Sequence, residues 1–181
     1  MLLDTHAHYD DEAFDADRDT LLESLKEYGI RKVINAGASV ESSYTGIKLA
    51  ERYPWVYAAL GAHPNYVEEL NKTVLRDFAA LAKHPKVVAI GEIGLEYHYE
   101  EPLRDVQKIW FRRQLDLAAE TGLPVIIHSR EAAQDTFDEM QCAAARGIGG
   151  VIHCFSSGAE LACRYAELGF YIGIGGVVTF K

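Results

Sequence analysis

The chain has 181 residues, of which 49% are hydrophobic and 25% charged, so it can bury a substantial core as a single domain over residues 1–181. Its formal net charge of −9 argues against a broad basic groove for nucleic acid, but it does not exclude an enzyme that meets phosphate through divalent ions. No apolar run is long enough to span a bilayer, and the first residues are not a secretory signal. The three cysteines form no C-x-x-C pair. These observations together predict a cytoplasmic protein with reduced thiols.

The chain begins with a short apolar run that ends in two histidines, Leu2-Leu3-Asp4-Thr5-His6-Ala7-His8. If the run is a β-strand, alternation places the imidazoles of His6 and His8 on the same face. Two imidazoles at the end of a strand form half of a metal site, because neutral imidazole is a common ligand of divalent metals. A pair of strand histidines with ordinary hydrogen bonds explains the motif equally well, so the choice depends on ligand-type residues further along the chain.

Further apolar, β-rich runs follow this first one, and helical patterns lie between them. The runs are Lys32–Ala38, Val56–His63, Val87–Leu95, Val125–His128, Gly150–Phe155 and Phe170–Val178. Three of the helical patterns end at a glycine, Gly29, Gly122 and Gly169, which is the residue that most readily closes a helix. The strands are apolar almost throughout, as expected when helices cover one face of a parallel sheet and a packed interior covers the other.

Polar residues at the strand ends distinguish between the two folds that a β/α alternation allows, an open doubly wound sheet and a (β/α)8 barrel. An open sheet collects its chemistry at one switch point, whereas a barrel collects it at the carboxyl ends of many strands. Here the predicted strands end in histidine or glutamate: His6 and His8, His63, Glu92, His128 and His153. We therefore expect an α/β fold of the (β/α)8 TIM barrel type, incomplete here, with about seven βα units and no eighth strand.

Glu92 lies in Gly91-Glu92-Ile93-Gly94-Leu95, at the end of a strongly apolar strand. A carboxylate there is costly to bury unless it is paired or metal-bound, and no lysine or arginine lies close in the sequence, so metal binding is favoured over a salt bridge. A lone histidine at the position of His128 or His153 is more often a hydrogen-bonded core residue, but these two end equivalent strands. Together with the amino-terminal pair they make a set of imidazoles and one carboxylate that suits two divalent ions, with Glu92 bridging them.

Four motifs stand in order and at the spacing of a known family: Asp4-x-His6-x-His8, Gly91-Glu92-Ile93-Gly94-Leu95-Glu96-Tyr97-His98, Ile127-His128-Ser129-Arg130 and His153-Cys154-Phe155-Ser156. The whole chain resembles the TatD-family metal-dependent deoxyribonucleases, which are amidohydrolase-like TIM barrels. The resemblance implies hydrolysis of phosphodiester bonds in DNA, often as a 3′ exonuclease, with two divalent metal ions that are magnesium, manganese or zinc. The family usually has aspartate where this chain has Glu96.

By the same resemblance, His6 and His8 bind one metal, His128 and His153 bind the other, and Glu92 is shared between them as the catalytic carboxylate. DNA is then the expected substrate. Our hypothesis for the reaction is that a water activated by both metals attacks the phosphorus in line, while the metals stabilise the leaving oxygen.

Three further residues are candidates for substrate binding. His63, in Gly61-Ala62-His63-Pro64, suits contact with a substrate phosphate or a metal-bound water, although a structural hydrogen bond explains it nearly as well. Arg130 suits a phosphate because guanidinium matches its geometry, and its alternative is a surface ion pair with Glu131 or another carboxylate. Tyr97 follows Glu92 closely and suits stacking on a base, with core packing as an equally good explanation.

The predicted seventh strand lies at the end of the chain, whereas a (β/α)8 barrel typically has roughly 250 residues. The family continues with a helix and an eighth strand, whose aspartate binds the first metal and is thought to orient the attacking water. The resemblance therefore implies a C-terminally truncated chain, which we expect to be unstable alone or to self-associate through the open barrel edges. We also expect the ion of His6 and His8 to be held less well than the ion of His128, His153 and Glu92.

Two other functions fit these residues. A metal-dependent amidohydrolase or lactonase acting on a small molecule uses the same scaffold, because one fold and one kind of metal site serve several chemistries. Such two-metal enzymes commonly bridge their ions with a carboxylated lysine, whereas this chain has Glu92 at that place. An inactive, truncated metal-binding protein is the third interpretation, and manganese-dependent hydrolysis of single-stranded DNA by the chain itself would exclude it.

Overall fold

The structure is a computed structural model that describes residues 2–180. Seven strands form one sheet in the order of the chain, β1 to β7, and every neighbouring pair is parallel. Their bounds are Leu2–Ala7 (β1), Ile30–Asn35 (β2), Val56–Leu60 (β3), Val87–Glu96 (β4), Val125–Arg130 (β5), Gly150–Ile152 (β6) and Tyr171–Ile172 (β7). Neighbouring parallel strands need a crossover connection, which the helices provide here.

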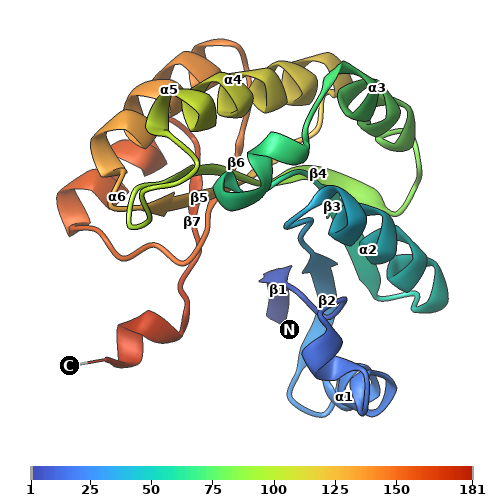
Figure 1. Cartoon of the computed structure of the whole chain (residues 1–181). Coiled ribbons are helices and arrows are strands. Elements are labelled where there is room, and N and C mark those ends of the chain that lie inside the picture. Colours follow the sequence, from blue (N-terminus) through green and yellow to red (C-terminus); the bar gives the residue numbers. More distant parts are fainter. Residues whose placement is uncertain (1, 181) are drawn as a thin grey trace.

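An α-helix lies between each pair of consecutive strands. The helices are α1 (Arg18–Ser24), α2 (Val40–Arg52), α3 (Lys72–Leu81), α4 (Arg104–Thr121), α5 (Ala133–Ala145) and α6 (Ala159–Glu167), with short 3-10 turns at Glu12–Phe14 (η1), Pro64–Glu69 (η2) and Gly176–Thr179 (η3). In Figure 1 the sheet curves into an arc, and the helices lie along its outer side. The described residues therefore form an open half-barrel of the (β/α)8 type, which confirms the predicted fold.

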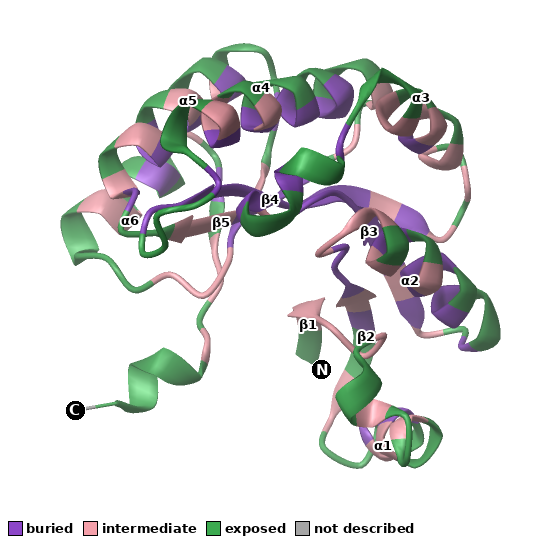
Figure 2. Ribbon diagram, viewed as in Figure 1, coloured by how far each residue is buried: buried purple, intermediate pink, exposed green. Residues whose placement is uncertain are grey.

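Strand β4 is buried along almost its whole length. Its sequence, VVAIGEIGLE, is apolar except for two glutamates, and only Val88 is less than fully buried. Helices cover one face of such a strand and the barrel interior covers the other, so both faces carry apolar side chains. Figure 2 shows β4 as a mostly buried strand in the middle of the arc, which places Glu92 deep in the structure.

Gly94 allows β4 and β5 to approach each other closely. Its φ is +148°, and a Cβ atom at this position would lie 2.0 Å from the backbone oxygen of His128. Every other residue carries a Cβ, so only glycine fits between the two strands here. The register pairs Gly94 with His128 and Glu96 with Arg130, so this close approach fixes where the histidine lies relative to β4.

The helix ends predicted at Gly122 and Gly169 are confirmed, since α4 ends at Thr121 and α6 at Glu167, and both glycines have a positive φ, 70° and 90°. The end predicted at Gly29 is wrong, because α1 already ends at Ser24 and a turn leads from there to Gly29, whose φ is 80°. Two other ends have polar caps that the pattern did not single out. The Ser39 and Asn71 side chains accept hydrogen bonds from the first free backbone N–H groups of α2 and α3.

The seventh strand is shorter than predicted. An extended strand over 170–178 is wrong, because β7 covers only Tyr171–Ile172 and the chain then forms η3. Gly173, Gly175 and Gly176 offer no side chains for a ladder in this segment. Within residues 2–180, β7 also pairs with β6 alone, so fewer backbone hydrogen bonds hold it extended.

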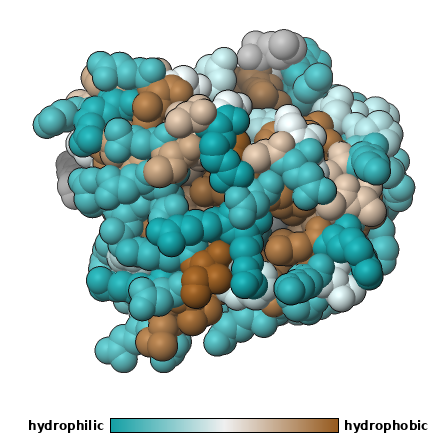
Figure 3. All heavy atoms as spheres, turned by 90° about the horizontal axis from the view of Figure 1, so that it is seen from above, coloured by the Kyte–Doolittle hydropathy of each residue, from teal (hydrophilic) through white to brown (hydrophobic). Residues whose placement is uncertain are grey.

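An apolar groove of about 850 Å³ lies between β1 and β7. Leu2, Leu3, Tyr171 and Ile174 line it and are 60%, 54%, 78% and 69% exposed. The outer face over the helices differs, since it is mostly hydrophilic with hydrophobic side chains in small patches (Figure 3). Among the described residues, no helix is both long and apolar enough to cross a membrane.

Candidate metal centre

Four of the five predicted ligands lie near or just beyond the end of a strand, whereas Glu92, predicted at a strand end, lies in the middle of β4, four residues before its end. His6 belongs to β1 and His8 follows it directly, Glu92 belongs to β4, His128 to β5, and His153 follows β6. Because parallel strands direct their carboxyl ends to one side of a barrel, residues far apart in the sequence meet there. The structure brings the four imidazoles together around the carboxylate of Glu92.

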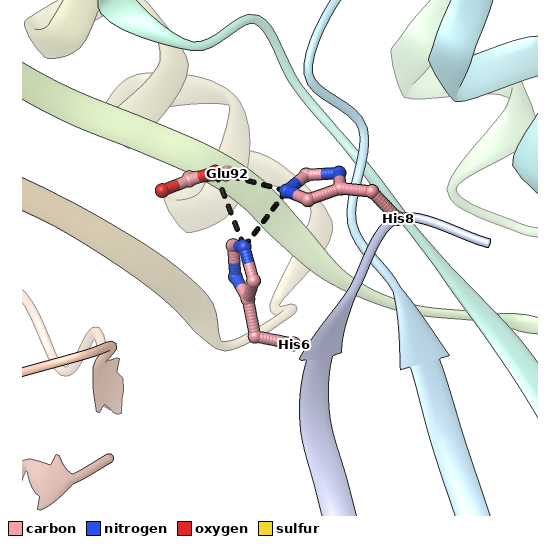
Figure 4. A group of neighbouring side chains, drawn as sticks. All are labelled: His6, His8 and Glu92. Carbon is pink, nitrogen blue, oxygen red and sulfur yellow. Dashed lines mark hydrogen bonds and ion pairs between the residues drawn. The ribbon is translucent and has the colours of Figure 1, made fainter. Parts of the chain in front are cut away.

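Glu92 is the centre of this group, and its two carboxylate oxygens face different histidines. Oε2 lies 3.3 Å from Nε2 of His6 and 3.5 Å from Nε2 of His8. Oε1 lies 2.8 Å from Nδ1 of His128 and 3.0 Å from Nε2 of His153. Figure 4 shows His6 and His8 approaching Glu92 from the end of β1. The carboxylate thus lies between two pairs of imidazoles.

The environment keeps Glu92 ionised. Burial by itself raises the pKa of a carboxyl group, but hydrogen bonds from His128, His153, His6 and His8 outweigh it and hold the pKa of Glu92 well below its usual range. The side chain is only 4% exposed. A buried carboxylate of this kind needs positive or hydrogen-bonding partners, and the imidazoles that surround it here would bind a divalent ion once they release the protons that they share with it.

On one side of Glu92, the hydrogen bonds of His8 set its tautomer. Nδ1 lies 3.1 Å from the carbonyl oxygen of Ala36, and because a carbonyl only accepts, Nδ1 carries a proton and Nε2 is the nitrogen left to face Glu92 or an ion. That Nε2 faces Nε2 of His6 at 2.9 Å. Nδ1 of His6 is buried without a hydrogen-bond partner among the described residues, and burial lowers the pKa of this ring. Both rings therefore direct Nε2 toward Glu92, as metal ligands do.

On the other side, His128 lies between two carboxylates. Its Nδ1 contacts Glu92 at 2.8 Å and its Nε2 contacts Oε2 of Glu96 at 3.1 Å. Burial lowers the pKa of His128, but the hydrogen bonds and charges of the two glutamates outweigh burial and raise it. The His153 ring lies stacked on the His6 ring at 3.7 Å between centroids, so the two sides of the centre are in contact.

His63 lies between β3 and η2, directly before Pro64, and joins the same group. His63, Glu92 and His128 offer ligand atoms that all lie within 4.8 Å of one another. However, Nδ1 of His63 accepts a hydrogen bond from the backbone N–H of Asn65 at 3.2 Å, and burial lowers the pKa of the ring to about 4. A neutral ring with Nδ1 as acceptor carries its proton on Nε2, so His63 presents a hydrogen-bond donor rather than a lone pair.

Arg130 and Tyr97 lie beside the group. Nη1 of Arg130 lies 3.9 Å from Oε2 of Glu96, and the side chain is 48% exposed. The carboxylate nearest to this arginine is therefore that of the buried Glu96 and not that of Glu131, which pairs with His98. Tyr97 is 9% exposed and donates its hydroxyl proton to Asp135 at 2.7 Å. Its contacts are those of a packing residue, and its role in binding substrate stays a prediction.

Two buried glutamines behind the site were missed from the sequence. Gln114 binds both backbone groups of Ala62, the residue before His63, at 2.8 and 3.1 Å. Gln107 binds both backbone groups of Glu96 at 2.9 and 2.8 Å. Both are fully buried on α4. The sequence does contain an indication of their role. The two amides lie seven positions apart among the apolar residues of the longest helical pattern, and a polar side chain that is buried there needs a hydrogen-bond partner.

A half-barrel of parallel strands whose ends meet at one glutamate and several histidines defines a metal-dependent hydrolase of the TIM barrel class. The family described as TatD related DNase matches residues 3–181. The chain belongs to this TatD family, as its motifs predicted.

Individual relatives agree with this assignment. The chain is 38% identical to the uncharacterized metal-dependent hydrolase YabD of Bacillus subtilis over all of its own length and 71% of YabD. It is 30% identical to the 3′-5′ ssDNA/RNA exonuclease TatD of Salmonella typhimurium, covering 91% of this chain and 64% of that protein. The crystal structure of YjjV from Escherichia coli superimposes with a TM-score of 0.92 at 34% identity, over 99% of this chain and 70% of YjjV.

Proposed function

We propose that the chain provides the metal centre of a phosphodiesterase that degrades DNA from its 3′ end with two divalent ions, magnesium, manganese or zinc. The observation that carries the proposal is the two-sided environment of Glu92, in which Oε2 faces His6 and His8 while Oε1 faces His128 and His153. A carboxylate in this position is suited to bridge two ions. The 3′-5′ ssDNA/RNA exonuclease named among the relatives supports nucleic acid as the substrate.

Ions bound at this centre would supply an activated water and neutralise charge on the phosphoryl group. Glu92 holds the two sides at a fixed separation, since it contacts the imidazoles of both. His8 is prepared for ligation, because the Ala36 carbonyl fixes the proton on Nδ1 and leaves Nε2 free. The ion charges also explain how a chain with a net charge of −9 accepts a polyanion.

His63 and Arg130 are the proposed contacts to the scissile phosphate. The Nε2–H of His63 donates a hydrogen bond to a phosphoryl oxygen, because its Nδ1 is already occupied as the acceptor for Asn65. Arg130 lies at the rim with 48% of its side chain exposed, so its guanidinium is free to bind a phosphate oxygen. Neither residue is needed to hold an ion in this arrangement.

The test is a Glu92→Ala variant of the full-length protein. With Mn²⁺ and a 5′-labelled single-stranded oligonucleotide, we expect stepwise shortening from the 3′ end by the unsubstituted protein and at least about a 100-fold loss in the variant. Glu120→Ala, at an exposed position on α4, is the matched control and should cleave normally. Wild-type turnover by Glu92→Ala would contradict the proposal, and cleavage of lactones or amides without any cleavage of DNA would favour the small-molecule hydrolase.

We also propose that the polypeptide of residues 1–181, expressed alone, self-associates along β1 and β7. Leu3 and Tyr171 line the apolar groove between these strands and are 54% and 78% exposed, and exposed strand edges are templates for pairing. Leu3→Lys with Tyr171→Lys should shift the species measured by light scattering toward monomer. Tyr28→Lys, at a 74% exposed tyrosine elsewhere, should not, and a monomer at all concentrations without any substitution would contradict the proposal.

We also propose that the chain forms a single domain and that the protein is cytoplasmic. One continuous apolar core contains residues from Leu22 to Phe170, which supports a single metal-dependent hydrolase domain over residues 1–181. Cys142, Cys154 and Cys163 are free thiols, and two of them are exposed. Unpaired exposed thiols are typical of a reducing compartment, which supports a cytoplasmic location.

A further inference from the structure

Glu96 is a buried carboxylate that the proposed ligand set does not use. It lies at the end of β4 and is 2% exposed, at the same side of the sheet as Glu92. Burying an ionisable carboxyl group costs free energy unless its oxygens are hydrogen-bonded or paired. The contacts that satisfy Glu96 therefore show what holds it there.

Both oxygens of the Glu96 side chain are engaged. Oε1 accepts a hydrogen bond from the backbone N–H of His98 at 2.9 Å. Oε2 lies 3.1 Å from Nε2 of His128, with Arg130 further away at 3.9 Å. The nearest side-chain partner of this buried carboxylate is thus the imidazole of His128.

Helix α4 fixes the backbone from which Glu96 projects. The Gln107 side-chain oxygen accepts the N–H of Glu96 at 2.9 Å, while its amide group donates to the carbonyl of Glu96 at 2.8 Å and to the carbonyl of Pro102 at 2.8 Å. Gln107 is completely buried. This cluster holds Glu96 in place without using either of its carboxylate oxygens.

The two ring nitrogens of His128 consequently face different carboxylates, Nδ1 facing Glu92 and Nε2 facing Glu96. A neutral imidazole has one N–H and one lone pair. Because Nε2–H donates to Glu96, Nδ1 is the nitrogen that an ion can use once Nδ1 releases the proton that it directs at Oε1 of Glu92, 2.8 Å away. A metal-bound histidine ordinarily donates its other N–H to a carboxylate or carbonyl, which fixes the tautomer and the plane of the ring.

We propose that Glu96 is the positioning residue of His128: it accepts the Nε2–H of the ring and so presents the Nδ1 lone pair to an ion held with Glu92. This inference rests on the metal centre proposed above and adds a residue that touches neither the ion nor the substrate. His8 has the equivalent support from the carbonyl of Ala36, so the two sides of the centre use a carboxylate and a carbonyl for the same purpose.

The test compares Zn²⁺ binding by the full-length protein and its Glu96→Gln variant by calorimetry. Glutamine has nearly the same shape but only one acceptor oxygen. If that oxygen continues to accept from His98, the amide group faces His128 and favours the proton on Nδ1, which is the wrong tautomer for ligation. We expect Zn²⁺ affinity to fall about 10- to 100-fold, whereas Glu100→Gln, at an exposed glutamate of the following loop, should bind as the unsubstituted protein does.

A second measurement determines which nitrogens of the His128 ring carry a proton. Long-range ¹H–¹⁵N spectra should show a protonated Nε2 at His128 in the unsubstituted protein, both metal-free and Zn²⁺-loaded, and an Nε2 without a proton in the metal-free Glu96→Gln variant. Glu96→Asp keeps the charge but is one methylene shorter, so its Zn²⁺ affinity should fall between the two. This variant also tests the inference if Glu96→Gln does not fold.

The outcomes separate this inference from the metal centre on which it rests. Glu92→Ala should abolish tight Zn²⁺ binding, and if it does not, the metal centre itself is wrong. If Glu92→Ala abolishes binding but the Glu96 variants bind Zn²⁺ within twofold of the unsubstituted protein, Glu96 has no positioning role. If Glu96→Asp and Glu96→Gln lose binding as completely as Glu92→Ala, Glu96 is a metal ligand and the positioning role is also wrong.

Discussion

The two sides of Glu92 differ in how firmly the chain supports them. His6 and His8 come from β1, whose first residues are exposed and which pairs with β2 alone within residues 2–180. His128 comes from β5, which lies between β4 and β6 and begins with three buried residues. The side chain of His8 is 35% exposed and that of His128 only 15%. One side of the centre is thus built on a strand edge and the other on the core.

This difference has an electrostatic counterpart. His128 contacts carboxylates through both ring nitrogens, Glu92 at 2.8 Å and Glu96 at 3.1 Å, whereas His8 has Glu92 at 3.5 Å and a neutral carbonyl behind it. Charged hydrogen-bond partners hold a ring more strongly than neutral ones do. Rigid support also lowers the ordering cost of binding. The better supported side should therefore bind an ion more tightly, in agreement with the expectation from the sequence motifs.

The largest expected effect is on Zn²⁺ affinity, and it tests directly which side of Glu92 binds its ion more tightly. His128→Ala should remove the tighter of two Zn²⁺ binding events, with a loss of affinity of at least about 100-fold. His8→Ala should leave that event within about twofold and affect only the weaker one, because His8 lies on the other side of the carboxylate. Calorimetric titration of both variants measures this. If His8→Ala removes the tighter event instead, the ranking of the two sides is reversed.

A somewhat smaller effect concerns the packing beneath the better supported side. Gly94→Ala places a Cβ atom 2.0 Å from the backbone oxygen of His128 at a φ of +148°, so β4 and β5 must separate. We expect the free energy of unfolding to fall by about 2.5 kcal/mol. Gly149→Ala, where a Cβ atom meets nothing within 4 Å, should change it by less than about 0.5 kcal/mol. Equal urea midpoints for the two variants would show that β4 and β5 do not need this close approach.

The smallest of the three effects is a dependence on pH. His63 has a pKa of about 4 because burial lowers it from 6.5, so the unfolded ring takes up a proton at a higher pH than the folded ring. The metal-free protein should therefore lose stability as the pH falls from about 6.5 to about 4, with about 2 kcal/mol of that loss due to His63.

His63→Asn isolates this contribution. Asparagine retains a side-chain acceptor for the backbone N–H of Asn65 and is a good helix cap, but it does not titrate. Urea unfolding at pH 4.5 and pH 7 should show a smaller pH dependence in this variant. An unchanged dependence would assign the acid sensitivity to the four histidines around Glu92 rather than to His63.

The strand-end residues of the site could be predicted from the sequence because they obey a local rule. His6, His128 and His153 lie at or near the end of an apolar run, and a parallel barrel brings such ends together whatever the length of the helices between them. Glu92 lies inside an apolar run, where a carboxylate needs a charged partner or a metal. The fold class follows from the same rule, since the runs alternate with helical patterns.

The remaining features depend on contacts between distant segments. The tautomer of His8 is set by Ala36, which lies 28 positions away in the sequence. The extent of β7 depends on its neighbours and not on its own apolar residues. A sequence pattern predicts on which face of a strand or helix a side chain lies, but it does not predict which group is its hydrogen-bond partner.

The two buried glutamines of α4 restrict how this chain can change its length. Gln107 and Gln114 lie seven residues apart, about two turns, and each holds the end of a different strand. One residue inserted between them would rotate one glutamine by about 100° relative to the other, away from its strand. Insertions and deletions should thus be tolerated in the loops around the half-barrel but not in this part of α4. The spacing of the two glutamines along α4 therefore sets the distance between the two strand ends that they hold.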